Sequence, residues 1–133
     1  IRTHLYLPCG AGAGQEPLTE QVLMEAMRRG RGFVSNFRWG DARGTRVYLR
    51  TDDGEVYLPG QCDHPPHPHG FIHVALPFPA TVRLVRNTAV VCRRTGRTLA
   101  FPVREKGVYR VECRRKGRPW IYANPFPVGP YPL

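Results

Sequence analysis

Apolar and polar residues alternate with a period of two along most of the chain from Gly32 onward. In Phe71–Leu76 every second residue is a large aliphatic one, and from Tyr109 to Arg114 apolar residues alternate with charged ones. Because successive side chains of a strand point to opposite faces, each segment offers one apolar face to a core. Turn residues recur about every ten positions, which is typical of an antiparallel sandwich or barrel.

This pattern predicts a mainly β fold, an antiparallel Ig-like β-sandwich preceded by one short α-helix. The segments that we predict as strands are Phe33–Arg38, Thr45–Thr51, Glu55–Leu58, Phe71–Leu76, Thr81–Arg86, Ala89–Arg93, Leu99–Val103, Val108–Arg114 and Trp120–Ala123. Trp120 and Tyr122 are expected to alternate with Ile121 and to bury a large aromatic area.

One segment, Leu18–Arg29, has the pattern of a helix. Thr19 is placed to cap its first turn, and Gly30 is placed to end it. Acidic Glu20 in the first turn and basic residues in the last turn match the charges of the helix dipole. An apolar stripe on one side of this helix is expected to dock on the rest of the protein; its members are Val22, Leu23, Ala26 and Met27.

Three segments are predicted to lie outside the regular elements. Glycines at positions 10, 12 and 14 indicate a linker, because no GK[ST] follows them as a phosphate-binding loop requires. Gln61–Gly70 contains three prolines and is expected to be an extended surface loop. Asn124–Leu133 carries four prolines, so we expect an extended strap over the surface and no central strand.

Composition is consistent with one soluble domain. The chain has 133 residues, 41% of them hydrophobic, and its 14 glycines and 14 prolines exclude long helices over most of its length. No apolar run approaches the roughly 20 residues of a membrane-spanning helix, so no membrane partner is predicted. The sequence begins at Ile1, so a targeting signal upstream would be invisible, and a cytoplasmic location is the default expectation.

The net charge of +10 arises from 18 arginines and two lysines against ten acidic residues. Such a charge suits nucleic acid, an acidic partner or an acidic neighbouring domain. If Ala89–Arg93, Leu99–Val103 and Val108–Arg114 form a meander, the first and third strands end at the same edge. The basic residues brought together there are Arg93, Arg94, Arg97, Arg114, Arg115, Lys116 and Arg118, which we call the strand-end cluster.

Two interpretations of the strand-end cluster stay open. Its arginines are suited to bind phosphate groups, with Trp120 or Tyr122 stacking on a base, so nucleic acid or another phosphate-bearing ligand is a predicted partner. The alternative is an ordinary solvated strand end, since charged turns are common.

A histidine-rich loop is the only metal-like cluster in the sequence. His64, His67 and His69 lie within six residues. In a polyproline II conformation, at about 3.1 Å per residue, the first two would stand about 9 Å apart, whereas zinc ligands lie about 2 Å from the ion. A metal site would therefore need the loop to fold back or two chains to contribute, and a plain surface loop is the alternative.

Catalytic patterns are absent. Ser35 is the only serine and has no GxSxG context. The acids Asp52, Asp53 and Glu55 flank Gly54 in a predicted turn, where solvation explains them. We therefore predict no catalytic residue in this chain.

Four cysteines, Cys9, Cys62, Cys92 and Cys113, show no CxxC spacing. Cys92 and Cys113 are predicted either to form a disulfide across strands or to be reduced and buried.

Three strings resemble a known family. Gly107–Glu112, followed by RPWIYANP at positions 118–125, is similar to the sequence that closes an accessory β-domain in bacterial proteins of the PHP (polymerase and histidinol phosphatase) superfamily. Arg2–Pro8 resembles a stretch that follows their last metal motif, with His4 where an aromatic residue is usual. Met27–Asn36 resembles a third passage, so the resemblance covers most of the chain in order.

The resemblance implies a non-catalytic accessory domain of a metal-dependent phosphoesterase, which is a hydrolase. The metal ligands of that family lie upstream of the part matched here, so a divalent metal is expected only in a catalytic domain preceding this sequence. Residues 1–31 are then a linker and helix that lead from that domain, and residues 32–133 are the β-sandwich. The upstream catalytic domain is the partner that this resemblance predicts.

Overall fold

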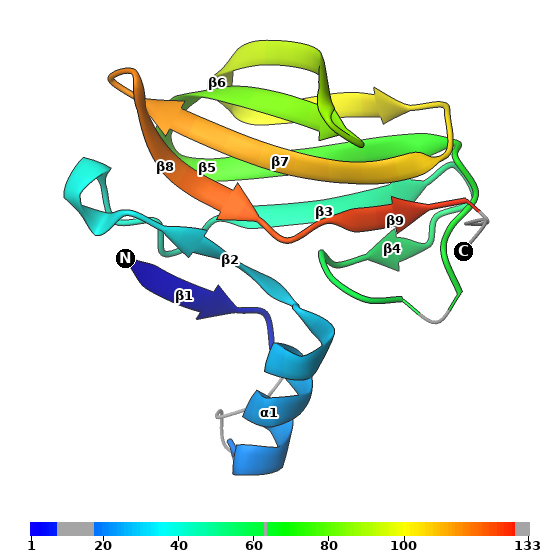
Figure 1. The fold of residues 1–133 in the computed structure, drawn as a ribbon, viewed down its shortest axis with the longest axis horizontal. Helices are drawn as coiled ribbons and strands as arrows, with labels where there is room; N and C mark the ends of the chain where they lie inside the picture. Colours follow the sequence, from blue (N-terminus) through cyan, green and yellow to red (C-terminus); the bar gives the residue numbers. More distant parts are fainter. Residues whose placement is uncertain (8–17, 63, 130–133) are drawn as a thin grey trace.

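The structure is a computed structural model that describes residues 1–7, 18–62 and 64–129. Its elements follow in the order β1 (Arg2–Leu5), α1 (Glu20–Arg29), β2 (Gly32–Ser35), the 3-10 helix η1 (Phe37–Trp39), β3 (Arg46–Thr51), β4 (Val56–Tyr57), β5 (Gly70–Arg86), β6 (Ala89–Val103), β7 (Gly107–Arg115), β8 (Arg118–Ala123) and β9 (Phe126–Val128) (Figure 1). All strand pairs are antiparallel. The predicted mainly β, antiparallel fold with one α-helix is confirmed.

The described strands form one nine-stranded sheet with the path β1-β2-β8-β7-β5-β3-β4, in which β6 also pairs with β5 and β9 with β7. The two longest strands, β5 and β6, pair with each other over nearly their whole length. The first half of β5 pairs with β3 and its second half pairs with β7. The Ig-like sandwich of two separate sheets is not confirmed, because β5 and β6 continue through both parts of a single sheet.

Two predicted strand breaks are wrong. Phe71–Leu76 and Thr81–Arg86 both belong to β5, and Ala89–Arg93 and Leu99–Val103 both belong to β6. The register between β5 and β6 shifts between Ala75 and Ala80. Prolines 77 and 79 fall in this unpaired interval, where a missing backbone N–H costs no ladder hydrogen bond, so they do not end the strand.

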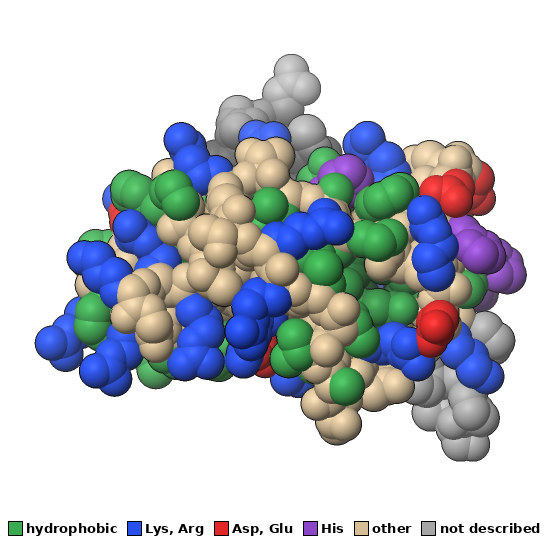
Figure 2. Space-filling model, turned by 90° about the horizontal axis from the view of Figure 1, so that it is seen from above, with side chains coloured by type: hydrophobic (Ala, Val, Ile, Leu, Met, Phe, Trp, Pro, Cys, Tyr) green, Lys and Arg blue, Asp and Glu red, His purple; other side chains and the backbone are tan. Residues whose placement is uncertain are grey.

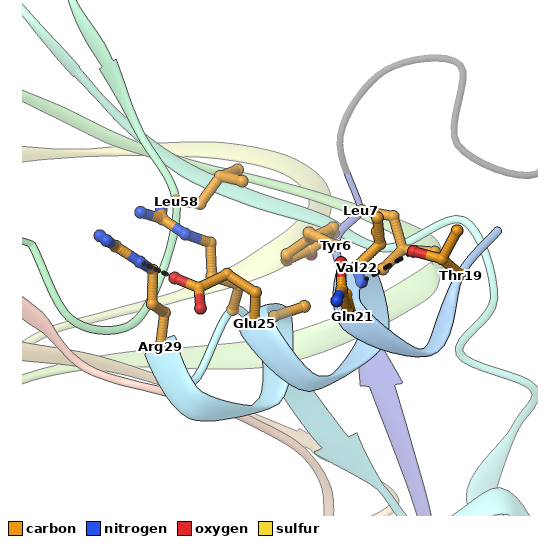
Figure 3. A pocket seen from close by; sticks show the side chains of 10 residues that line it. Tyr6, Leu7, Thr19, Gln21, Val22, Glu25, Arg29 and Leu58 are labelled. Carbon is orange, nitrogen blue, oxygen red and sulfur yellow. Dashed lines mark hydrogen bonds and ion pairs between the residues drawn. The ribbon is translucent and has the colours of Figure 1, made fainter. Parts of the chain in front are cut away.

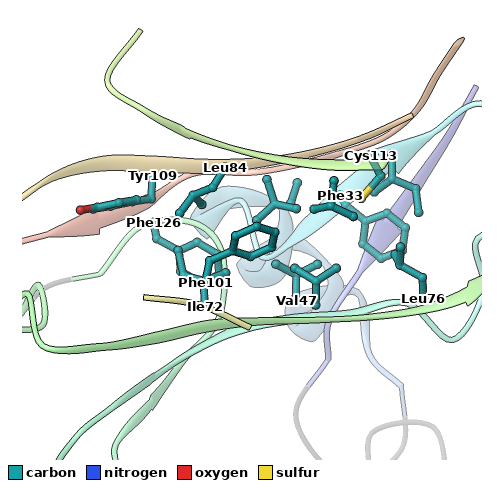
Figure 4. Packing of buried hydrophobic residues seen from close by; sticks show 14 of the residues in the cluster. Phe33, Val47, Ile72, Leu76, Leu84, Phe101, Tyr109, Cys113 and Phe126 are labelled. Atoms are coloured by element: carbon teal, nitrogen blue, oxygen red, sulfur yellow. The ribbon is translucent and has the colours of Figure 1, made fainter. Parts of the chain in front are cut away.

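The sheet is curved so that two parts of it lie opposite each other, and the core is formed by the side chains between them (Figure 4). Val47 and Ile72 lie opposite Leu84 and Phe126 there, and all four are at most 1% exposed. The fully buried side chains of greatest volume are Trp120, Phe101, Phe126, Leu49, Ile72, Leu84, Ile121, Val47, Val74, Val82, Val103 and Val111. Each contributes about 1.5–3 kcal/mol by burial. The inward faces read from the alternation are confirmed, since residues 72, 74, 76, 109, 111 and 113 are all buried.

The predicted helix is confirmed with its caps. The Thr19 hydroxyl accepts a hydrogen bond from the Val22 amide at 3.2 Å, and Gly30 ends the helix at φ 68°. The apolar stripe is narrower than predicted, because Ala26 is buried but Met27 is 64% exposed. The described helix is ten residues long, and no helix in residues 1–7, 18–62 and 64–129 is long and apolar enough to span a membrane.

Both ends of the chain take part in the sheet, which corrects two predictions. Arg2–Leu5, assigned to the linker, is strand β1 and pairs with β2. In the predicted strap, Phe126–Val128 is strand β9 and pairs with β7. Burial of Phe126 and Val128 drives this pairing, and Pro127 is tolerated because β9 has only one neighbouring strand. The glycine-rich linker at positions 10–14 and residues 130–133 lie outside the described residues.

Strand β8 also differs from its predicted pattern. Its register with β7 shifts next to Trp120, so Trp120 and Ile121 are both buried, at 1% and 0% exposure. Tyr122 is 38% exposed, so its expected burial is wrong. Upstream, the predicted strand Phe33–Arg38 ends at Ser35, because Asn36 caps η1 by accepting a hydrogen bond from the Arg38 amide.

Candidate functional site

The structure brings the residues of the strand-end cluster to one end of the sheet through a strand arrangement that differs from the predicted meander. No turn separates Arg93 from Arg97, since both lie within β6. Strands β6 and β7 instead flank the second half of β5, so that Thr95 and Arg114 both pair with Thr81. The cluster therefore lies near one end of this part of the sheet, around the β7–β8 turn.

The members of the strand-end cluster do not share one face. Arg93 pairs with Arg83 and is exposed, whereas Arg94 donates to the Ala100 carbonyl at 2.6 Å and lies 5.5 Å from the Phe101 ring. Arg115 donates to the Trp39 carbonyl at 2.7 Å. These hydrogen bonds give Arg94 and Arg115 structural roles, and the Arg97 Nε also contacts a backbone carbonyl, that of Leu76, at 3.5 Å.

Arg114 is half-buried, and its Nη2 donates to the Gly117 carbonyl at 3.4 Å. Three members of the cluster remain available to a ligand, because they are exposed and form no ion pair with an acidic residue in the described part of the chain; they are Arg93, Lys116 and Arg118. Lys116 and Gly117, with φ values of 53° and 72°, form a tight hairpin turn, which directs Lys116 and Arg118 outward. Trp120 is too buried to stack on a base, whereas Tyr122 is exposed.

An acidic residue lies beside this cluster. Glu112 is 7% exposed and is bridged by Arg83 at 2.5 Å and Arg110 at 2.9 Å. Burial by itself raises the pKa of Glu112, but the hydrogen bonds and charges of the two arginines outweigh it and leave the pKa below its usual value of 4.5. Glu112 is therefore ionised at neutral pH and cancels part of the positive charge.

The histidine loop faces an acidic turn. His64, His67 and His69 line a pocket of about 390 Å³ together with Asp52, Asp53 and Glu55. The hydrogen bond that Thr51 donates lowers the pKa of Asp53. A weaker electrostatic effect of His67 acts in the same direction. No three of the described His, Cys, Asp and Glu side chains are placed to hold one metal ion.

A second basic surface was not found from the sequence. It lies on the outer face of the first half of β5 and of β3, where Tyr48 pairs with His73 and Arg50 pairs with Phe71. We call it the aromatic–arginine face, and its residues are Arg46, Tyr48, Arg50, Phe71, His73 and Arg104. On the face of the molecule that Figure 2 shows, Lys and Arg side chains are numerous, apolar side chains lie between them, and acidic side chains are few.

The rings of the aromatic–arginine face contact one another. Tyr48 and His73 are stacked with ring centroids 4.9 Å apart, and Phe71 and His73 are 6.4 Å apart. The guanidinium groups of Arg50 and Arg104 lie 5.7 Å and 5.0 Å from the rings of Tyr48 and Phe71. Burial, with a smaller effect from Arg50, lowers the pKa of His73 below 6.5, so its ring is neutral at pH 7.

The alternation of residues 46, 48 and 50, and of 71 and 73, was the available signal for this face. His73 was correctly predicted to point away from the core, but nothing in the sequence indicated which strand lies beside it. The register of β3 against β5 brings the two sets together.

Ser35 and His4 form the one serine–histidine contact of the described chain. The Ser35 Oγ lies 2.8 Å from His4 Nε2, and Ser35 is 2% exposed. Burial lowers the pKa of His4, and its ring is stacked on Phe33 at 4.3 Å. A hydroxyl so buried is unsuited to attack a substrate, and the contact instead joins β1 to β2.

A further pocket of about 390 Å³ lies between α1 and the residues that follow β1 (Figure 3). Tyr6, Leu7, Val22 and Leu58 point toward it. Its carboxylate, Glu25, accepts a hydrogen bond from Arg29 at 2.6 Å, which lowers the pKa of Glu25. The lining of this pocket is mainly apolar, and among its described residues it holds no two groups suited to act together as general acid and general base.

The described cysteines are all free. Cys92 pairs with Leu84 and Cys113 pairs with Val82, so β5 separates them. Of the two alternatives, the disulfide is therefore wrong; both thiols are free, Cys113 buried and Cys92 half-buried. Burial raises the pKa of the Cys113 thiol to about 12, which makes it unreactive.

Comparison with protein-family models, with curated proteins and with solved structures finds no match to this chain.

Proposed function

We propose that this chain is a non-catalytic accessory β-domain of a PHP-type metal-dependent phosphoesterase, which stabilises the catalytic barrel or shapes access to its metal site. The observation that supports it best is the position of the strings that carry the resemblance. They form four neighbouring strands, β1-β2-β8-β7. Segments distant in the sequence therefore build one continuous part of the sheet.

The residues of these strings have structural roles in that part. Trp120 Nε1 donates to the Gly40 carbonyl at 3.0 Å and anchors the loop after η1. Asn124 Nδ2 donates to the Gly30 carbonyl at 2.7 Å, and its backbone amide donates to the Gly32 carbonyl. These contacts tie the helix end to the end of β8, which is what a rigid connection between two domains requires.

Hydrolysis assays and the upstream gene sequence test this proposal. The chain should not hydrolyse a phosphomonoester above the background of manganese or zinc alone. Coding sequence upstream of Ile1 should encode a barrel with an HxH metal motif. Turnover that disappears in His64→Ala or His67→Ala, or an unrelated upstream domain, would contradict the proposal.

A second candidate function is binding of nucleic acid or another phosphate-bearing ligand at the strand-end cluster. The exposed Arg93, Lys116 and Arg118, without acidic partners among the described residues, favour it. Their replacement with glutamine should then remove most of the affinity for a phosphate polymer, measured by filter binding at two salt concentrations.

A further inference from the structure

The aromatic–arginine face combines positive charge with aromatic rings on the outer surface of the sheet, where Phe71 is exposed and Tyr48 and His73 are half-buried. Arg46, Arg50 and Arg104 are exposed, and none forms an ion pair with an acidic residue in residues 1–7, 18–62 and 64–129. Phe71 is 37% exposed although it is a large apolar side chain.

The unpaired charge favours an anionic ligand. Arginine binds phosphate oxygens through a planar group with several donors. Arg50 and Arg104 lie against the rings of Tyr48 and Phe71, and Arg46 is two residues from Tyr48 on the same face of β3. The side chains of Arg46 and Arg50 make no hydrogen bond with the described residues, so both can turn toward a ligand. Arg104 is fixed by hydrogen bonds to the carbonyls of Gly70 and Val103 at 3.0 and 3.1 Å.

The rings favour a ligand with flat, unpaired bases. Tyr48, His73 and Phe71 come from two adjacent strands and share one face. Because Tyr48 and His73 are stacked on each other, the rings available to ligand bases are the exposed Phe71 ring and the side of the Tyr48 ring that points away from His73. An exposed guanidinium on a ring is a weaker contact than a base on a ring, so a base can displace Arg50 from Tyr48. Bases in a duplex are paired and stacked, and their faces are not available.

We propose that the aromatic–arginine face binds single-stranded nucleic acid, with bases on the rings and phosphates at the arginines. Stacking on aromatic side chains beside a basic groove is the general mode of sequence-tolerant single-strand binding. This inference goes beyond the accessory role and uses a surface other than the strand-end cluster. An acidic protein ligand would contact the arginines of this face but would have no bases to stack on its aromatic rings.

Binding of a labelled oligothymidylate, followed by fluorescence anisotropy at two salt concentrations, tests this proposal. Phe71→Leu keeps an apolar side chain and removes the ring, so affinity should fall about tenfold with the salt dependence unchanged. The double variant Arg46→Gln, Arg50→Gln should bind more weakly, with the slope of log affinity against log salt reduced by about 1.4.

The control removes two charges elsewhere. Arg93→Gln with Arg118→Gln should lose much less affinity than the double variant on the face. A larger loss in this control would overturn the proposal and support the strand-end cluster. Wild-type affinity in Phe71→Leu, equal affinity for polyaspartate or for a duplex, or no binding at low salt would also overturn it.

Two further measurements keep the outcome interpretable. Phe71→Trp should bind at least as tightly as the wild type, and no variant should have a lower thermal midpoint than the wild type, because the substituted side chains lie outside the core. The hydrolysis assay is independent of this binding. Failure of the accessory role and failure of this inference are therefore separate results.

Discussion

At the scale of single residues, Glu112 is the one charged residue that is buried in the described part of the chain. It is almost fully buried, yet it joins β7 to Arg83 of β5 by an ion pair of 2.5 Å. Removing one partner of a buried pair leaves the other charge without compensation, which is strongly destabilising. Here the cost is reduced because the Arg83 side chain is still 21% exposed to water.

We predict that Glu112→Gln lowers the free energy of unfolding by about 2 kcal/mol at pH 7. Because the folded-state pKa of Glu112 is below 4.5, its contribution is fully present above pH 4.5 and is lost as the pH falls through the folded-state value. Urea unfolding at pH 7 and at pH 3 should therefore show a difference between variant and wild type that shrinks in acid.

Glu105→Gln is the matched control for this prediction. Its carboxylate pairs with Arg86 but is 65% exposed, so the loss should be below about 1 kcal/mol. Equal losses in the two variants, or a constant difference across pH, would show that the burial of Glu112 does not matter.

At the scale of elements, the end of α1 is fixed by close backbone packing. Gln61 donates to the Arg29 carbonyl at 2.6 Å, and Gly60 donates to the Pro125 carbonyl at 2.8 Å. A Cβ atom on Gly60 would lie 2.1 Å from the Arg29 carbonyl oxygen, so only glycine fits there. The helix itself buries only Ala26 fully, so these contacts at its end position it.

We predict that Gly60→Ala is more destabilising than Gly54→Ala by about 1–3 kcal/mol, because it adds a steric clash. Both glycines have positive φ, 113° and 91°, but nothing lies within 4 Å of a Cβ atom on Gly54. Thermal unfolding measures the difference, and hydrogen exchange in α1 should accelerate only in Gly60→Ala. Similar midpoints in both variants would mean that the helix is positioned by other contacts.

At the scale of the whole molecule, positive charge is the dominant property. The net charge of +10 on 133 residues implies repulsion within the folded protein. The described ion pairs involve few of the arginines, and most of these pairs are at the surface. Added salt should therefore weaken the repulsion among the positive side chains more than it weakens the attraction within the ion pairs.

We predict that sodium chloride raises the thermal midpoint between low salt and physiological ionic strength, where the screening length is about 8 Å. A phosphate polymer at the same ionic strength should raise it further, because a ligand of the folded state stabilises that state. A midpoint that falls with salt would show that surface ion pairs contribute more than repulsion costs.

The sequence by itself determined the local features of this protein. Alternation predicted that residues 72, 74 and 76 of β5 and residues 109, 111 and 113 of β7 are buried, because the side-chain direction in a strand depends only on the backbone. It did not predict the burial of Glu112. Thr19 and Gly30 predicted both ends of α1, because capping involves neighbours within one turn. Whether Cys92 and Cys113 form a disulfide, in contrast, depends on which strand lies between them in the sheet.

Only the tertiary structure decided how the strands join and which outer side chains meet. The break expected at Pro77 and Pro79 did not occur, because the partner strand shifts its register there. Arg50 lies beside Phe71, and Tyr48 beside His73, only through the pairing of β3 with β5. Strand pairing depends on residues far apart in the sequence, and a shift of one residue reverses every face, so alternation alone does not specify these neighbours.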